Sequence, residues 1–262
     1  MLVDGQQRIT TLYQYFTGSP DLRLGDVRPY TKLNSDEKVN FLEYEVVVRD
    51  LGKKSIEEIR EVFTRINSTK YSLNAMEIHN ARFDGAFKVF AEEITQHQFF
   101  EDHMVFRTND IRRMGDMVFC LSVIITILST YFNRDNELED YLEKYNDEFP
   151  HADDVRKELS KTFGFIDKCQ LPNSCRAWKK ADLFTLLVEA HRALFKDKVD
   201  LNPQETGRRL AEFYERVDKV GAGVDEHDEV GRYYKASLQA TNDRSSRITR
   251  GQVLRKVLLD EL

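Results

Sequence analysis

The sequence predicts an α+β fold that is mostly α, with a partial α/β core over residues 1–75 and a helical domain over residues 76–262. Apolar residues recur at helical spacing through most of the chain, whereas the pattern between Asp21 and Gly52 is that of strands. The composition, with 41% hydrophobic and 32% charged residues, 12 Gly and 5 Pro, is typical of a helix-rich globular protein. This composition excludes disordered and fibrous proteins.

The first element is predicted to be a strand-turn-helix unit. Leu2-Val3 followed by Asp4-Gly5 is typical of a strand end and a turn, and because no partner strand precedes it, we expect an upstream segment to be missing. A helix follows and ends at Gly18, with Pro20 just beyond. Its apolar residues recur at helical spacing: Ile9, Leu12, Tyr13 and Phe16.

The segment between Asp21 and Gly52 favours two strands because it combines alternating and continuous apolar stretches. Its branched and aromatic residues include Leu22, Leu24, Val39, Phe41, Tyr44, Val46 and Val48. A helix is then expected to begin at Ser55, since Ser55 and Glu58 have the spacing of a capping box. The polar turn at residues 67–70 ends that helix.

The rest of the chain predicts a helical bundle. A helix beginning at Leu73 or Asn74 is expected to turn apolar residues toward a core: Met76, Ile78, Phe83, Phe87 and Phe90. Further helices are expected over residues 109–132, 136–146, 152–168, 176–196, 203–219 and 228–258. The most hydrophobic stretch, Met117–Phe132, has 16 residues. It is shorter than the ~20 residues that cross a bilayer, so we expect a buried core helix.

Charge and cysteine content narrow the class of protein. Lys and Arg number 39 and Asp and Glu 45, which gives a net charge of −6. The three cysteines, Cys120, Cys169 and Cys175, lack CxxC spacing, which argues against a disulfide framework and a thiolate zinc site. No signal-peptide pattern follows Met1. These features predict a soluble, cytoplasmic protein without membrane association.

The densest polar cluster is Asp4-Gly5-Gln6-Gln7-Arg8, at the expected helix start. A helix N-terminus offers free backbone N–H groups, Gly5 permits close approach, and Arg8 adds a bidentate donor, which together suit a phosphate. Gln6 and Gln7 suit orientation of a water or reading of a base edge, and Asp4 suits a metal ligand or a general base. The alternative is that Asp4 is only a helix N-cap.

A second cluster lies at the end of the helix that begins at Ser55. Arg65, Asn67 and Ser68 supply positive charge and neutral donors that fit phosphate oxygens. The alternative is a helix C-terminus at which Arg65 and Lys70 compensate the helix dipole.

The third candidate site is a basic segment near the end of the sequence. Between Arg232 and Lys256, seven basic residues stand against one acid, Asp243. Within this segment we identify candidate nucleic-acid-binding residues, Arg244, Arg247 and Arg250. The alternative is a solvated helix face.

Several segments together resemble the DGQQR family, the domain at the N-terminus of GmrSD-type modification-dependent restriction endonucleases and related phage-defence proteins. They are Leu2–Leu12, Val62–Thr69 and Leu73–Ala81, and Tyr233–Leu254 is similar to the end of many such proteins. The resemblance spans essentially the whole chain. It implies a ParB/sulfiredoxin-like core, incomplete in this sequence, with a helical extension.

The resemblance also implies NTP binding, with GTP or ATP as the nucleotide, and hydrolysis assisted by Mg²⁺ in a DNA-restriction or phage-defence system. Carried over onto this sequence, the catalytic residues are Asp4, Gln7 and Arg8, with Asp4 also the metal ligand. The cofactor-binding residues are Gly5, Gln6, Thr10, Arg65, Asn67 and Ser68.

DNA and a separate nuclease subunit are the expected partners, because no HNH pattern follows Arg250. Whether the chain forms an oligomer is left open. The alternatives are a non-catalytic module that binds DNA or a protein partner, and an inactive truncated remnant.

Overall fold

The computed structural model of the chain describes residues 6–19, 22, 27–48, 52, 55, 58, 74–220 and 228–262. The chain divides into an N-terminal unit, residues 1–74, and a C-terminal unit, residues 75–262. Among the residues described, no helix is both long enough and apolar enough to span a membrane.

The described part of the N-terminal unit is helical. It contains α1 (Gln6–Thr17), a 3-10 turn (Tyr30–Lys32) and α2 (Ser35–Leu42). Four rings hold these elements together, with centroids 5.0 to 6.5 Å apart: Tyr15, Phe16, Tyr30 and Phe41. The hydroxyl of Tyr15 also donates to the carbonyl of Arg28 at 2.7 Å.

The prediction of strands within residues 21–52 is wrong for the part described, where no strand is present. Residues 35–42 are helical because Asn34 and Glu37 form a capping box. The Asn34 side chain accepts from the Glu37 N–H at 2.8 Å, and the Glu37 carboxylate accepts from the Asn34 N–H at 2.9 Å. Residues 44–48 form no strand, and Val47 is 93% exposed. A β core is therefore not seen among the described residues.

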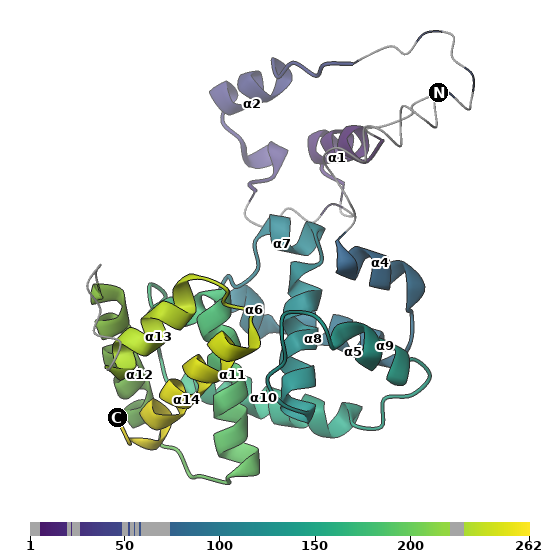
Figure 1. Ribbon diagram of the computed structural model, residues 1–262. Helices are drawn as coiled ribbons and strands as arrows, with labels where there is room; N and C mark the ends of the chain where they lie inside the picture. The colour runs from purple at the N-terminus through teal and green to yellow at the C-terminus, as the bar shows by residue number, and fades with distance from the viewer. Residues whose placement is uncertain are drawn as a thin grey trace. The chain divides into compact units, whose positions relative to one another are not determined.

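The C-terminal unit is a bundle of helices (Figure 1). Its elements are α4 (Ala75–Arg82), α5 (Ala86–Thr95), α6 (Gln98–Asp102), α7 (Thr108–Arg112), α8 (Gly115–Leu128), α9 (Leu138–Lys144), α10 (Ala152–Lys168), a 3-10 turn (Arg176–Trp178), α11 (Lys180–His191), a π turn (Arg192–Lys196), α12 (Pro203–Lys219), α13 (Glu229–Leu238) and α14 (Arg244–Leu259).

Two helices form the centre of the bundle. In α8 every residue from Met117 to Ile127 except Val118 is buried, which confirms the expected core helix. In α11 every residue from Asp182 to His191 is buried. These two helices contact each other; α5, α7 and α9 contact α8, and α10 and α14 contact α11. A helix that is buried on all sides must be surrounded in this way.

Several predicted helices are confirmed, and others are each two helices in the structure. The predicted bounds 152–168 and 203–219 are those of α10 and α12. The predicted helix 228–258 is instead two helices, because Ala240 adopts a left-handed φ of 49° between α13 and α14. A φ of 55° at Met114 likewise separates α7 from α8.

The predicted core face of α4 is correct except at one position. Met76, Phe83 and the following Phe87 and Phe90 are buried, whereas Ile78 is 45% exposed. Phe83 directly follows the last residue of α4, and Phe87 and Phe90 lie in α5, so the helix expected to begin at Leu73 or Asn74 is two helices in the structure.

Candidate functional site

The first candidate site is the beginning of α1. Gln7, Arg8 and Thr10 lie in or next to its first turn and are exposed, and that turn carries no acidic residue. The N–H groups of a first helical turn and its positive dipole end favour an anion. The other predicted residues of this site lie outside the described residues, as does the side chain of Gln6: Asp4, Gly5, Arg65, Asn67 and Ser68.

No group of three or more His, Cys, Asp or Glu side chains able to hold a metal occurs within the described ranges. Asp4, the predicted metal ligand, is not among them.

The second candidate site is the basic segment, which forms α13 and α14. Both helices pack on each other and on α12, and α14 also packs on α11. The structure does not bring the three predicted arginines to one exposed surface. Arg247 is 4% exposed and Arg250 is 0% exposed, whereas Arg244 is exposed.

Arg250 is a buried structural residue. Its guanidinium donates from Nε to Thr185 Oγ1 at 3.1 Å, from Nη1 to the Ala236 carbonyl at 2.7 Å, and from Nη2 to the Thr241 carbonyl at 2.8 Å. Burial lowers the pKa of this guanidinium, and Tyr233 and Asp182 oppose that effect. The interpretation of Arg250 as a phosphate-binding residue is therefore corrected, because its donors are directed into the protein.

Arg247 requires the same correction. Its Nη1 donates to the Phe132 carbonyl at 3.1 Å, and its guanidinium lies 4.8 Å and 4.6 Å from the ring centres of Phe132 and Phe184. Burial lowers the pKa of Arg247 to about 10. This side chain stabilises the core through cation–π contacts and is not placed to meet a nucleic acid.

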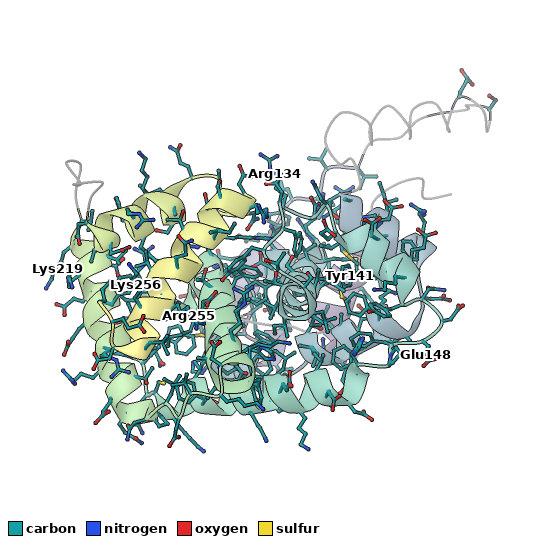
Figure 2. All side chains as sticks on the ribbon, turned by 60° about the horizontal axis from the view of Figure 1, so that its bottom comes forward. Arg134, Tyr141, Glu148, Lys219, Arg255 and Lys256 are labelled. Carbon is teal, nitrogen blue, oxygen red and sulfur yellow. The ribbon has the colours of Figure 1, made fainter. Side chains whose placement is uncertain are left out.

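Arg244 remains a surface residue at the start of α14. Its Nε donates to the Tyr131 carbonyl at 2.9 Å, and its backbone N–H donates to Asn133 Oδ1 at 3.2 Å. Arg255 and Lys256 lie further along α14 (Figure 2). Arg255 pairs with Asp197 at 2.6 Å, and Lys256 pairs with Glu229. Arg255 and Lys256 are thus each paired with a local acid.

Sequence reasoning missed a buried polar cluster beside Arg250. Asp182 is 1% exposed, accepts from Tyr233 Oη at 2.7 Å and pairs with Arg176 Nε at 3.2 Å. Burial raises the pKa of Asp182, against the opposing effect of Arg176. The signal was present in the sequence, since Asp182 and Glu189 stand among the apolar residues of α11 and a buried carboxylate needs partners.

A second missed cluster surrounds Glu189. Its Oε1 accepts from Tyr131 Oη at 2.6 Å and from Arg192 Nη1 at 2.7 Å. Gly251 of α14 packs against this pair, since a Cβ there would lie 2.6 Å from Tyr131 Oη and 2.8 Å from Glu189 Oε1. Both clusters join helices to one another, and neither opens to a described cavity.

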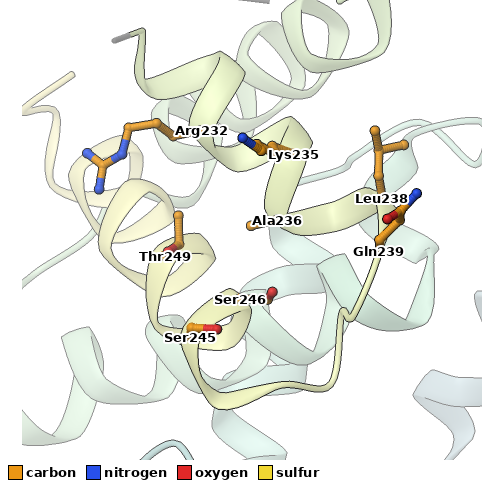
Figure 3. Close-up of a pocket in the computed structure, with 8 residues that line it drawn as sticks. All are labelled: Arg232, Lys235, Ala236, Leu238, Gln239, Ser245, Ser246 and Thr249. Atoms are coloured by element: carbon orange, nitrogen blue, oxygen red, sulfur yellow. The ribbon is translucent and has the colours of Figure 1, made fainter. Parts of the chain in front are cut away.

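A hollow of about 640 Å³ lies between α13 and α14 (Figure 3). It is lined by Arg232, Lys235, Ala236, Leu238, Gln239, Ser245, Ser246 and Thr249. Cationic side chains come from α13 and hydroxyls from α14, so the surface of the hollow suits an anionic ligand.

The described geometry therefore offers two surfaces on which an anion can bind, the first turn of α1 and the hollow between α13 and α14. Each belongs to a different unit of the chain. No protein-family model, curated protein or solved structure matches this chain.

Proposed function

We propose that this chain is an NTP-binding and NTP-hydrolysing component of a DNA-restriction or phage-defence system, acting with a separate nuclease subunit. The observation that carries the proposal is the polar cluster from Asp4 to Arg8, immediately before and within the first turn of α1. The resemblance of this cluster and of Val62–Thr69 to the DGQQR family supports the same function.

The chemistry follows from the residue types. Arg8 supplies positive charge to the terminal phosphate, the N–H groups of the α1 first turn donate to phosphate oxygens, and Gln7 orients the attacking water. Asp4 is the carboxylate assigned to Mg²⁺, which when bound neutralises phosphate charge. Arg65 and Asn67 contribute further donors.

Titration calorimetry of the full chain with GTP and ATP, with and without MgCl₂, tests the proposal. Arg8→Gln is expected to weaken binding about tenfold or more, because a charge-assisted hydrogen bond to phosphate contributes about 1.5–3 kcal/mol. The matched control is Arg28→Gln, which removes an exposed arginine of the same unit that already pairs with Glu37. Equal binding by wild type and Arg8→Gln would contradict the proposed site.

Hydrolysis is measured separately as phosphate release. Asp4→Ala is expected to abolish Mg²⁺-dependent release while leaving Mg²⁺-free nucleotide binding in place. If wild-type protein binds NTP without releasing phosphate, the chain is a nucleotide-dependent binding module rather than an enzyme.

DNA is the partner proposed for such a system. Of the arginines that suggested it, Arg244 alone is exposed, and Arg232 and Lys235 add exposed positive charge on α13. Phosphate contacts of this kind predict affinity for DNA that falls steeply as salt concentration rises.

A further inference from the structure

The hollow between α13 and α14 combines two kinds of group that recognise phosphate. Arg232 and Lys235 lie on one face of α13 by their i, i+3 spacing, and Gln239, which directly follows the helix, also lines the hollow. Across the hollow, Ser246 and Thr249 lie on the facing side of α14, three residues apart (Figure 3). The hollow lies wholly within the C-terminal unit.

The hydroxyl groups of the hollow are available to a ligand. The side chains of Ser245, Ser246 and Thr249 make no hydrogen bond with any other residue that the structure describes. A hydroxyl can donate one hydrogen bond and accept two, and in a helix it commonly bonds a carbonyl four residues back, as Thr126 does to Ser122 at 2.7 Å. Three hydroxyls of one helix face without such a bond are free to donate to phosphate oxygens.

The charge of the hollow is positive at its α13 side. Arg232 pairs through Nη1 with Glu229 at 3.1 Å and leaves its other guanidinium nitrogens to face a second partner, and Lys235 adds an ammonium group. Glu229 is shared with Lys256, and Asp243 pairs with Arg134 at 2.9 Å. No acidic side chain lines the hollow among the described residues.

The walls of the hollow are held in place from the interior. The Arg250 guanidinium binds the carbonyl of the lining residue Ala236 and that of Thr241, in the turn that closes the hollow. Arg176 donates to Ser237 Oγ at 2.9 Å, which fixes the same helix from its buried side. A site formed by fixed walls loses less entropy when a ligand binds.

We propose that this hollow binds the phosphate of a nucleotide, either a free nucleotide or a nucleotide within a DNA strand. Its volume of about 640 Å³ exceeds what a single phosphate fills and lies within the roughly 300–1,000 Å³ typical of small-molecule sites. This site is independent of the one proposed at α1.

Ser246→Asp tests the inference. It places a carboxylate in the hollow, where like charge repels phosphate, yet an acid in the first turn of α14 favours the helix dipole and does not disturb folding. The neutral variant Ser246→Asn, nearly equal in size, measures the effect of bulk alone. Arg208→Gln is the matched surface control, because Arg208 pairs with Glu212 on α12 and does not line the hollow.

Binding of ATP, of GTP and of a short single-stranded deoxyoligonucleotide is measured by calorimetry on the full chain. We expect Ser246→Asp to weaken at least one of these ligands about tenfold or more relative to Ser246→Asn, and Arg208→Gln to bind as wild type. Loss of the oligonucleotide alone identifies DNA as the source of the phosphate, and loss of ATP or GTP identifies the free nucleotide.

Equal affinities of Ser246→Asp and Ser246→Asn for every ligand would overturn the inference. Arg8→Gln, measured in parallel, separates it from the proposed function. If nucleotide binding is lost in Arg8→Gln alone, the α1 site is supported and the hollow is rejected. If binding is lost in Ser246→Asp alone, the hollow is supported and the α1 site is rejected. If neither variant weakens the binding of any ligand, both sites are rejected.

Discussion

Replacing Arg250 with Ala is expected to destabilise the C-terminal unit by about 4 kcal/mol. Three acceptors lose their donor, the buried Thr185 hydroxyl and the partly buried carbonyls of Ala236 and Thr241. At about 1 kcal/mol for each acceptor and about 0.8 kcal/mol for each of two lost methylenes, the loss is between 4 and 5 kcal/mol. The lower end applies because removing the side chain also relieves the burial of a charge.

The comparison variant is Arg255→Ala on the same helix. Arg255 pairs with Asp197 at 2.6 Å, but the two side chains are 38% and 33% exposed. An exposed ion pair of this kind contributes about 1 kcal/mol or less. The two substitutions therefore remove the same side chain from α14 and differ in its burial.

Urea unfolding followed by tryptophan fluorescence measures both variants. Trp178 is the one tryptophan of the sequence and lies in the C-terminal unit, stacked on His103 with ring centres 3.6 Å apart. Its signal therefore reports on that unit. A loss below about 1 kcal/mol for Arg250→Ala, or one equal to that of Arg255→Ala, would refute the buried role and restore Arg250 as a surface residue.

Three further predictions concern helix packing and pH. Gly207→Ala should lower the free energy of unfolding by about 2 kcal/mol or more in urea titrations, because its Cβ would lie 2.0 Å from the backbone oxygen of Cys169. Gly164→Ala should raise it by about 1 kcal/mol, because no atom lies within 4 Å of the new methyl and alanine favours the helix; destabilisation would contradict the open surroundings. Glu93→Gln should lower the melting temperature at pH 6 but progressively less below the ordinary pKa of 4.5, since the hydrogen bonds from Arg156 lower the pKa of Glu93 and that stability is lost as pH falls through the folded value. A difference that persists unchanged into acid would show that the pair contributes no charge-dependent stability.

The helices with one clear apolar stripe could be predicted from the sequence. The stripe of α10 and the Asn202 cap with Pro203 at the start of α12 are local signals, and both helices have the predicted bounds. The break at Ala240 could not be predicted, because a left-handed alanine has no signature of its own. The carbonyl of neighbouring Asn242 accepts from the Arg134 N–H at 2.8 Å, a contact 108 residues away in sequence.

The strand prediction failed for a related reason. Val39 and Phe41 favour a strand by residue type, but Asn34 and Glu37 satisfy the first N–H groups of a helix, and the local hydrogen bonds prevail. The capping box predicted for Ser55 and Glu58 is confirmed, since their reciprocal bonds are present at 2.8 and 3.2 Å.

The site predictions show the limit of charge patterns. Arg244, Arg247 and Arg250 have equal spacing, which makes one helix face basic whether that face meets water or the core. What separates them is the position of acceptors such as the Phe132 carbonyl and Thr185 Oγ1, which lie in distant segments. The hydroxyls of the hollow, by contrast, carry no charge and so do not stand out in a charge pattern.

The bonds from Arg250 to the carbonyls of Ala236 and Thr241 also govern how the protein opens. In many proteins a terminal helical hairpin exchanges its amide hydrogens through local fraying, well before the core does. Here α13 and the turn after it can separate from α14 only by breaking both bonds to the guanidinium, which Thr185 of α11 also holds. The C-terminal hairpin and the central helix α11 therefore belong to one cooperative unit, and their slowest amides exchange together.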